Sequence, residues 1–486
     1  MFDLIGSDIA IRHAGSPIAG EIAGLTADSR LVQPGYLFAA LPGRRDDGRR
    51  FIADALKRGA VAVLGTPGLA KPPGVALLES DNPRQALAKL AARFYGDQPR
   101  HIAAVTGTSG KTSVVAFARQ LWTQLGHPAA SLGTLGIVAP GFTRYGSLTT
   151  PDPVSLHQYL ADLARSGVDH LAMEASSHGL DQYRLDGVRV TVAAFTNLTR
   201  DHLDYHATMA DYFAAKKRLF SEVMVRGGVA VLNADVPEFA ELAALARTRG
   251  HRIIDFGRQA SALRLVAQVP APEGQHLTLR VEKRLAQVTL PLVGDFQAMN
   301  ALAALGLVIG CDEKADAAVA LIASLAAVPG RLERVALRRN GAAVYVDYAH
   351  KPGALETVLR TLKVHAAGRL VVVLGCGGDR DPGKRPMMGE IAQRIADRVI
   401  VTDDNPRSED PAKIRRQILV GCPGAREIGS RREAIFHAVA GLAAGDLLVV
   451  AGKGHESGQI VGETVLPFDD AIVAREAVAA ADGEAA

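Results

Sequence analysis

The chain has 486 residues, of which 48% are hydrophobic and 22% are charged, a composition that excludes the intrinsically disordered class. This length allows about three domains, each with a core of its own. The net charge is +4 and the basic residues are scattered, which argues against a dedicated nucleic-acid-binding surface.

The amino terminus "MFDLIGSDIA" carries Asp3 and Asp8 and no basic stretch, so it does not have the form of a secretory signal. Apolar runs such as "LVVVLG" from Leu370 are shorter than the roughly 20 residues that cross a bilayer. We therefore expect a cytoplasmic protein without a membrane span, ending in a loose tail, "AAADGEAA". Separated cysteines without CxxC spacing predict reduced thiols rather than disulfides or a thiolate metal site: Cys311, Cys376 and Cys422.

Short apolar runs recur along the chain, and each is followed by glycine or polar residues and then by a helical pattern. This alternation predicts an α/β fold with mainly parallel sheets. Ligands of such sheets bind beyond the carboxyl ends of the strands, where the unusual polar residues of this chain fall. The runs are "HIAAVTGT", "HLAMEASSHG", "VTVAAFTNLTRDH", "GGVAVLNAD", "AVYVDYAH", "RLVVVLGCGGDRD", "RVIVTDDNPR" and "DLLVVAGKGHE".

Two segments have the composition of domain boundaries. The first, "FYGDQPR", precedes His101, and the second, "LAAVPGRLERV", surrounds Pro329. We therefore expect three domains, over residues 1–98, 99–329 and 330–486.

The run from His101 leads into G-T-S-G-K-T and then into a helical pattern, which is the context of a phosphate-binding loop. A standard loop would have glycine at the position of Val105, so this one is shortened. Inward-turned N–H groups and the helix start favour an anion, with Lys111 on the phosphates and Thr112 on Mg²⁺. The alternative is a glycine-rich turn with an incidental Gly-Lys-Thr. The loop residues are Gly107, Thr108, Ser109, Gly110, Lys111 and Thr112.

Two further runs end in residues that can bind a metal. Glu174 follows one apolar run and His202 follows the next, so both could face one cleft. A glutamate after a strand is by itself more often solvated or a helix-cap partner. The segment "DYFAAKKRLF" places Lys216 beside Lys217, and two adjacent lysines are usually a solvated helix face.

The loop T-G-T-S-G-K-T, with E-x-S-S-H-G-L and N-L-x-x-D-H-L-D-x-H, resembles the Mur ligases and the related folylpolyglutamate synthetases. The resemblance implies a uridine-nucleotide-binding α/β domain, a central P-loop ATPase domain and a carboxyl-terminal Rossmann-like domain. It also implies that ATP activates a carboxylate as an acyl phosphate, which an amine then attacks. The catalytic set that it implies, with magnesium held by Thr112, Glu174, His202 and a carbamate on Lys216, is Lys111, Lys216, Glu174 and His202.

Three more segments match the nucleotide contacts of this family. "GDFQAMNALAA" is similar to G-x-F-N-x-x-N-x-x-A-A, which assigns Asn300 to adenine, whereas Gln297 departs from the pattern. "PGRLE" supplies Arg331 for the nucleotide, and "VDYAHKPGAL" supplies Asp347 for the ribose with His350 nearby.

The segment "LTADSRLVQPGYLF" resembles the uridine-nucleotide domain of the Mur ligases and places Ser29 and Arg30 by the uridine diphosphate. Folylpolyglutamate synthetases lack this domain. The family also assigns to the muramoyl dipeptide a set that unaided would be ordinary turn and cap residues: Thr149, Thr150, Ser177, Gln182 and Arg184.

The last third of the chain carries "DDNPR", the pattern of family members that add meso-diaminopimelate, whereas lysine-adding members differ at the arginine. A guanidinium can bind the distal carboxylate of diaminopimelate with two hydrogen bonds. Without the resemblance, Arg407 would be a solvated loop charge. The expected amine-binding residues are Arg380, Asp404, Asn405, Pro406, Arg407, Gly452 and Glu456.

Together these motifs predict a ligase that uses ATP and Mg²⁺ to add meso-diaminopimelate to UDP-N-acetylmuramoyl-L-alanyl-D-glutamate in peptidoglycan synthesis. We expect a monomer with no nucleic-acid partner. The alternatives are the L-lysine-adding ligase, a folylpolyglutamate synthetase and a non-catalytic ATP-binding regulator. Arg407 and Arg380 argue against the lysine-adding enzyme, and an intact metal and phosphate set argues against the regulator.

Overall fold

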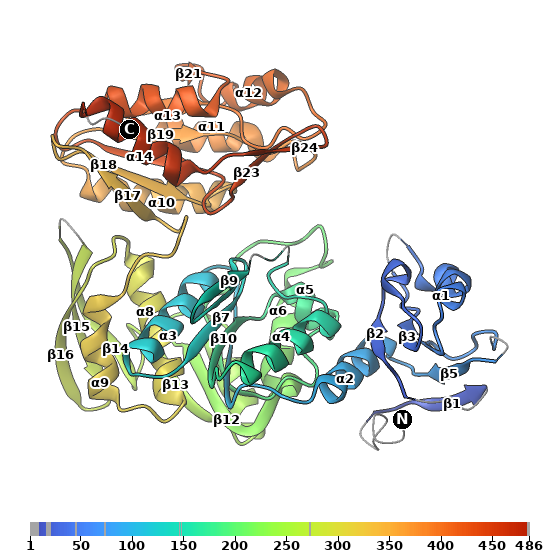
Figure 1. The fold of residues 1–486 in the computed structure, drawn as a ribbon. Helices are drawn as coiled ribbons and strands as arrows, with labels where there is room; N and C mark the ends of the chain where they lie inside the picture. Colours follow the sequence, from blue (N-terminus) through green and yellow to red (C-terminus); the bar gives the residue numbers. More distant parts are fainter. Residues whose placement is uncertain are drawn as a thin grey trace. The chain divides into compact units, whose positions relative to one another are not determined.

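The computed structural model describes residues 9–15, 21–43, 46–71, 74–144, 146, 148–271 and 274–483 (Figure 1). Most of "MFDLIGSDIA" and the last three residues of the tail lie outside this range. The chain forms two compact units. The first comprises residues 1–265, 280–284 and 300–321, and the second comprises 266–279, 285–299 and 322–486. Both are α/β, as the sequence predicts. The finer division into residues 1–98, 99–329 and 330–486 stays a proposal.

The amino-terminal part of the first unit is a five-stranded sheet in the order β1-β5-β4-β3-β2. Its strands β2 to β5 are parallel and β1 is antiparallel at the edge. Buried Leu37, Leu64 and Leu87 form its core. The elements are β1 (Arg12–Gly15), β2 (Gly24–Thr26), η1 (Ser29–Leu31), β3 (Tyr36–Ala39), η2 (Gly48–Phe51), α1 (Ile52–Lys57), β4 (Ala62–Gly65), β5 (Ala76–Glu79) and α2 (Pro83–Tyr95).

The central sheet of the first unit has the strand order β13-β12-β11-β6-β10-β7-β8-β9. From β13 to β7 the strands are parallel, and β8 and β9 form an antiparallel edge. The parallel strands are almost wholly apolar because both faces of the sheet are covered. The strands are β6 (His101–Thr106), β7 (Ala129–Gly133), β8 (Gly136–Ala139), β9 (Phe142–Arg144), β10 (His170–Glu174), β11 (Val190–Phe195), β12 (Met224–Asn233) and β13 (Arg252–Gly257).

The helices of this part follow the strands, as the α/β pattern requires. Many start at capping residues; Thr208 and Asp211, for example, form a reciprocal cap at the start of α6. The helices are α3 (Lys111–Gln124), α4 (Pro153–Arg165), α5 (Ser177–Asp181), α6 (Met209–Arg218), the π-helix η3 (Leu219–Val223), α7 (Phe239–Thr248), α8 (Asp295–Gly310) from Asn300 onward, α9 (Ala315–Ala320) and η4 (Leu321–Ser324), which begins at the last residue of this unit.

The second unit contains a six-stranded sheet in the order β17-β18-β22-β19-β20-β21. Alternate residues of "LVVVL" face opposite cores: Val372 packs toward α10, α11 and α12, whereas Val371 and Val373 pack toward α13 and α14. The elements are β17 (Glu333–Leu337), β18 (Ala343–Asp347), α10 (Pro352–His365), β19 (Leu370–Leu374), α11 (Lys384–Ile395), β20 (Arg398–Val401), α12 (Pro411–Leu419), β21 (Arg426–Glu427), α13 (Arg431–Ala440), β22 (Leu447–Ala451) and α14 (Asp470–Ala481).

Five further strands belong wholly or mainly to the second unit: β14 (Leu263–Ala271), β15 (Gly274–Val281), β16 (Arg284–Leu290) and the hairpin of β23 (Gly458–Val461) and β24 (Thr464–Pro467). The three cysteines are free and buried, as expected for reduced thiols, and burial raises the pKa of Cys376 to about 12. In the described part of the chain, no helix is long and apolar enough to cross a membrane.

Candidate active site

The shortened phosphate loop joins β6 to α3 and depends on two glycines. Gly107 has φ +145°, and a Cβ there would lie 1.9 Å from Thr196 Oγ1. Gly110 has φ +89°, and a Cβ there would lie 2.5 Å from Asn300 Oδ1. Larger residues would therefore be both strained and obstructed at the two positions. Thr112 follows in the first turn of α3, largely buried.

The segment after β11 fixes the shape of this loop. Asn197 Oδ1 accepts a hydrogen bond from Ser109 N at 3.0 Å, and Thr196 Oγ1 donates to Ser109 O at 2.7 Å. Thr108 Oγ1 accepts from Thr199 N at 3.0 Å. Of this segment, only His202 was predicted from the sequence, although the asparagine of N-L-x-x-D-H is the residue that signals the loop contact.

Two lysines converge on the loop carbonyl of Gly107. The Nζ atoms of Lys111 and Lys216 each donate to Gly107 O at 2.8 Å, and Lys111 also donates to Thr108 O at 2.9 Å. Both amines therefore lie at the turn that the sequence predicts to hold phosphate. Two ammonium groups in such proximity repel each other, which favours loss of a proton from the more buried one.

Lys216 is the more buried of the two, at 1% exposure, and lies 4.3 Å from the centre of the Tyr212 ring. Burial and the nearby Lys111 charge hold the pKa of Lys216 well below its usual range, against the opposing charge of Asp201. The adjacent Lys217 instead pairs with Glu241 on the surface. The two adjacent lysines therefore differ in environment: Lys216 is buried at the phosphate loop, and Lys217 lies at the surface.

Glu174 ends β10 at the same edge of the sheet and is 1% exposed. Its Oε1 accepts from Thr134 N at 2.8 Å and its Oε2 from Thr134 Oγ1 at 3.3 Å. Thr149 Oγ1 lies 3.1 Å from Thr134 Oγ1, and Thr150 Oγ1 donates to Glu174 O at 3.0 Å. The predicted metal ligand and two predicted substrate residues are therefore joined in one hydrogen-bonded group.

His202 has a left-handed backbone, φ +52°, and its imidazole is 40% exposed. Asp201 holds it, with Oδ1 accepting from His202 N at 2.8 Å and Oδ2 at 3.5 Å from Nε2. The His178 ring lies edge-on to it at 4.8 Å, and His206 lies beyond, 5.8 Å from His178. Neither His178 nor His206 was predicted from the sequence.

The predicted donors fit magnesium in kind. Mg²⁺ prefers hard oxygen ligands, and Glu174 and Thr112 supply a carboxylate and a hydroxyl. The amine of Lys216 is unsuited to Mg²⁺, whereas a carbamate on the same nitrogen would supply oxygen. His202 adds an imidazole.

The residues predicted to hold the muramoyl dipeptide form a second group. Arg184 donates from Nη1 to Thr150 O at 2.7 Å and from Nη2 to Gln182 Oε1 at 2.8 Å, and burial lowers its pKa. Gln182 in turn donates to the Tyr205 hydroxyl at 3.1 Å. Ser177 begins α5 and is buried. Tyr205 was not predicted, although it lies in the quoted motif.

Ser29 and Arg30 lie in η1, in the amino-terminal sheet, where the exposed Arg30 guanidinium pairs with Asp28 at 2.6 Å. Among the described residues, the hydrogen bonds and ion pairs of Ser29 and Arg30 do not reach the phosphate loop. Asn300 lies against the phosphate loop, as the Gly110 geometry shows. Gln297, which departs from the family pattern, is buried in the second unit.

In the second unit, Asp347 ends β18. Its Oδ2 accepts from Leu332 N at 2.6 Å and its Oδ1 from Ala349 N at 2.7 Å. Burial raises the pKa of Asp347 to about 6, against the opposing charge of Arg331. The Arg331 guanidinium lies 4.7 Å from the centre of the Tyr348 ring, and burial lowers the pKa of His350 to about 4.

The residues predicted to bind the amine substrate meet at the carboxyl ends of β19, β20 and β22. Asn405 Nδ2 donates to Glu456 Oε2 at 2.8 Å. A Cβ on Gly452 would lie 2.7 Å from Asp404 Oδ2. Lys453 is fully buried, and its Nζ donates to Asn405 Oδ1 at 3.0 Å and to Glu456 Oε2 at 3.1 Å. Lys453 was not predicted from the sequence, because only the fold brings it to Asn405.

The two arginines flank a glycine turn. Arg407 Nη1 donates to Gly378 O at 2.8 Å. A Cβ on Gly377 would meet Arg407 Nη1 at 2.7 Å and Arg380 Cγ at 3.8 Å, so both side chains border this residue. Arg407 has φ +51°, and its N–H and C=O bond the β23–β24 hairpin. Pro406 packs its carbonyl against Gly378.

Comparisons with known proteins identify the family of the chain. Three family models match the chain. The model of the Mur ligase family catalytic domain matches residues 21–95, that of the Mur ligase middle domain matches residues 105–308, and that of the Mur ligase glutamate ligase domain matches residues 330–454. The chain therefore belongs to the Mur ligase family. It is an ATP-dependent ligase of the three-domain Mur architecture.

The most similar relatives include enzymes named UDP-N-acetylmuramoyl-L-alanyl-D-glutamate--2,6-diaminopimelate ligase. The one from Bradyrhizobium diazoefficiens is 54% identical over 99% of this chain and 98% of its own length, and the one from Brucella melitensis is 54% identical over 95% and 94%. A solved structure of a ligase with this name has a TM-score of 0.70 at 34% identity, covering 94% of each chain. The folylpolyglutamate synthase of Mycobacterium tuberculosis shares the fold at 23% identity, with a TM-score of 0.62 over 76% of this chain and 92% of its own.

Proposed function

We propose that the chain joins meso-diaminopimelate to UDP-N-acetylmuramoyl-L-alanyl-D-glutamate at the expense of ATP, in the cytoplasm, during peptidoglycan synthesis. The observation that carries this choice is the group at the end of β20, where Arg407 and Arg380 border one glycine and Glu456 is bonded to Asn405. It offers cations for a distal carboxylate and an anion for a distal ammonium. A lysine side chain would use only the anion.

The proposed reaction begins at the phosphate loop. The turned N–H groups of residues 107–110 and the Lys111 ammonium bind the β- and γ-phosphates, and the α3 amino terminus favours their charge. The side-chain carboxylate of the D-glutamate attacks the γ-phosphorus, and the bond to ADP breaks. Thr112, Glu174, His202 and a Lys216 carbamate would hold the magnesium ion, which would supply positive charge against the two anions that must approach each other.

A carbamate on Lys216 is part of this proposal. The amine is buried and its pKa is well below the usual range, which favours the neutral form that reacts with CO₂. The product would be an anion at the turn where both amines donate to Gly107 O. The carbamate would attract the Lys111 ammonium, whereas a protonated Lys216 would be repelled by it.

In the second half of the reaction, the diaminopimelate amine attacks the acyl-phosphate carbonyl and phosphate leaves. The residues at the carboxyl ends of β19, β20 and β22 are proposed to bind the distal end of the diaminopimelate. Arg184, bonded to Thr150 and Gln182, supports binding of the muramoyl dipeptide in the first unit. Arg331 and Asp347 are assigned to the nucleotide.

Phosphate release from ATP tests the proposal. With the uridine muramoyl dipeptide present, meso-diaminopimelate should give rapid release and a tripeptide product, while L-lysine and L-glutamate should give little. Preference for lysine would support the lysine-adding ligase, glutamate addition to a folate would support the folylpolyglutamate synthetase, and ATP binding without turnover would support the regulator. Any of these results would contradict the proposed substrate.

A further inference from the structure

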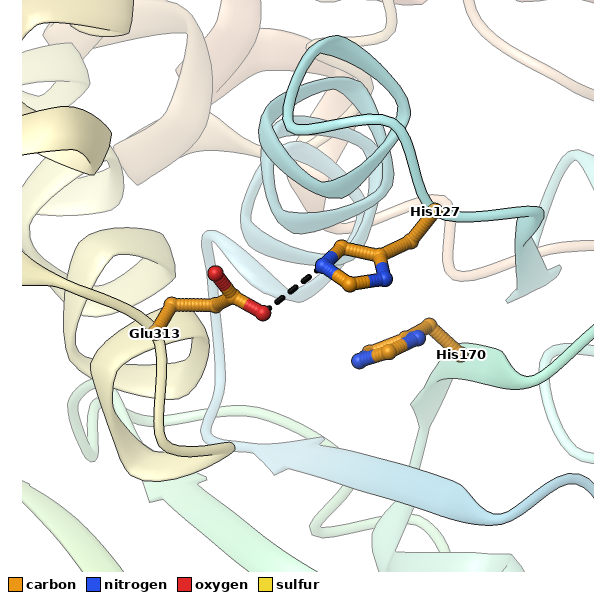
Figure 2. A group of neighbouring side chains, drawn as sticks. All are labelled: His127, His170 and Glu313. Atoms are coloured by element: carbon orange, nitrogen blue, oxygen red, sulfur yellow. Dashed lines mark ion pairs between the residues drawn. The ribbon is translucent and has the colours of Figure 1, made fainter.

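A cluster of histidines and carboxylates lies at the amino-terminal edge of the central sheet, away from the phosphate loop. His170 is the first residue of β10, His127 lies in the turn between α3 and β7, and Glu313 lies between α8 and α9. Figure 2 shows the three side chains pointing toward one another. All three belong to the first unit. The proposed ligase reaction uses none of them.

The geometry of this cluster fits a small cation. His127 Nε2 lies 2.7 Å from Glu313 Oε1, and one ligand atom from each of the three residues lies within 4.8 Å of the others. Ligand atoms around a tetrahedral Zn²⁺, at about 2.0–2.2 Å from the ion, are separated by roughly 3.3–3.5 Å. Shifts of about an ångström would therefore bring the three atoms to one ion. His127 is 30% exposed and Glu313 20% exposed, so a water can reach the fourth position.

A second carboxylate orients the buried histidine. His170 is 4% exposed at its side chain, and its Nδ1 lies 2.7 Å from Asp169 Oδ1. A histidine that donates one ring N–H to a carboxylate presents the lone pair of its other nitrogen, an arrangement common to histidine ligands of metals. The His101 ring, stacked at 4.5 Å, and Trp122, at 5.1 Å, fix the ring further.

The cluster is separate from the magnesium ligands in place and in chemistry. Four residue-to-residue steps of extended strand, about 13 Å, separate His170 from Glu174 at the other end of β10. Two imidazoles and one carboxylate suit Zn²⁺ and similar transition ions, whereas the predicted magnesium site is made mainly of oxygen donors.

We propose that His127, His170 and Glu313 form a second metal site, which binds one divalent transition ion of the Zn²⁺ type. The ion would tie the turn after α3 and the start of β10 to the turn between α8 and α9. The site is structural rather than catalytic, because it lies at the opposite edge from the reacting groups.

The chain offers a specific reporter for this site, because Trp122 is its single tryptophan. The full-length protein, freed of metal with a chelator, is titrated with Co²⁺ in excess Mg²⁺. We expect one equivalent of Co²⁺ to quench the Trp122 fluorescence and to give visible absorption bands of a four-coordinate ion, and Zn²⁺ to displace it. Zn²⁺ should also raise the melting temperature.

Variants locate the ion. Glu313→Gln and His127→Gln should each weaken Co²⁺ binding at least about tenfold, and Asp169→Asn, which changes only the orienting carboxylate, should weaken it by roughly 10-fold. His276→Gln removes an exposed histidine bonded to Thr289 and should leave the affinity unchanged. Absence of stoichiometric Co²⁺ binding, unquenched Trp122, or equal affinity in wild type and Glu313→Gln would each overturn the proposal and leave an ordinary ion pair with stacked rings.

Discussion

At the scale of single residues, Arg407 is the side chain that we propose decides the choice of amine. Replacing it with alanine should lower kcat/KM for meso-diaminopimelate by roughly 30-fold or more. This factor corresponds to a loss of about 2–5 kcal/mol of transition-state stabilisation, the scale of a lost charge pair. The KM for ATP should not change. Steady-state kinetics with each substrate varied in turn measures both. Arg416→Ala, an exposed arginine with a weak 3.6 Å pair to Asp410, is the matched control. Equal losses for both substrates would contradict the assignment.

Lys216 and Lys217 form a matched pair of neighbours for a test of the carbamate. Lys216→Arg should reduce kcat by roughly 100-fold, since a guanidinium cannot carry the carbamate oxygens that stabilise the reacting phosphate. Lys217→Arg should have little effect, because that side chain pairs with Glu241 on the surface. NMR with ¹³C-bicarbonate should show a carbamate carbon in the wild-type protein and none in Lys216→Arg. Full activity in Lys216→Arg would exclude the carbamate.

Asp347 gives a prediction about pH. Burial raises its pKa to about 6, so the carboxylate that we propose accepts a ribose hydroxyl is lost as the pH falls through 6. The KM for ATP should rise below pH 6 in the wild type, and Asp347→Asn should have a raised KM that no longer depends on pH in this range. The raised pKa has the reverse effect on folding stability. The protonated Asp347 favours the folded state at low pH, and this contribution is lost as the pH rises from 3.8 through about 6.

Some of these residues could be assigned from sequence and others could not. Lys111, Glu174 and His202 lie in contiguous motifs after strands, so pattern and resemblance identify them together. Lys216 could be chosen over Lys217 only by its register in the family motif, and burial provides the physical reason. Lys453 and Asn197 contact groups far along the chain, and local pattern carries no information about such partners.

At the scale of elements, Lys453 connects the loop after β22 to the loop after β20. Its ammonium donates to Asn405, Glu456 and Gly458 O without any exposure to water. Lys453→Met should raise the KM for diaminopimelate roughly 10- to 100-fold, by analogy with the loss of outer-shell ligand support. The effect on kcat should be smaller, because Lys453 positions other side chains. Lys363→Met, which breaks an exposed pair with Asp397, is the control. A fall in kcat alone would contradict this positioning role.

The sequence was informative about elements where burial imposes a pattern. Parallel strands covered on both faces are continuous apolar runs, so they were recognised, and with them the edge where Asp347, Asp404 and Gly452 gather. The antiparallel edge strands β8 and β9 are short and exposed in part, and the π-helix η3 depends on packing after α6. Such elements leave no distinct periodicity.

At the scale of the whole molecule, each unit has hydrophobic cores of its own. A destabilising substitution in one unit should therefore not unfold the other unit. The pair of Arg431 and Asp470 offers the test, because both side chains are 0% exposed and joined by two 2.7 Å hydrogen bonds. Asp470→Asn leaves a buried guanidinium unpaired, which should cost about 3–5 kcal/mol.

Hydrogen exchange read by mass spectrometry resolves the location of this loss. Peptides from β18, β19 and β22 should exchange faster in Asp470→Asn, while peptides from β6 and β10 keep their wild-type protection, because the two sets belong to different units. Glu476→Gln breaks the neighbouring Arg432 pair, which is 54% and 42% exposed, and should change stability by less than about 1 kcal/mol. Faster exchange throughout both units would mean that they unfold as one, and the independence inferred from their separate cores would be wrong.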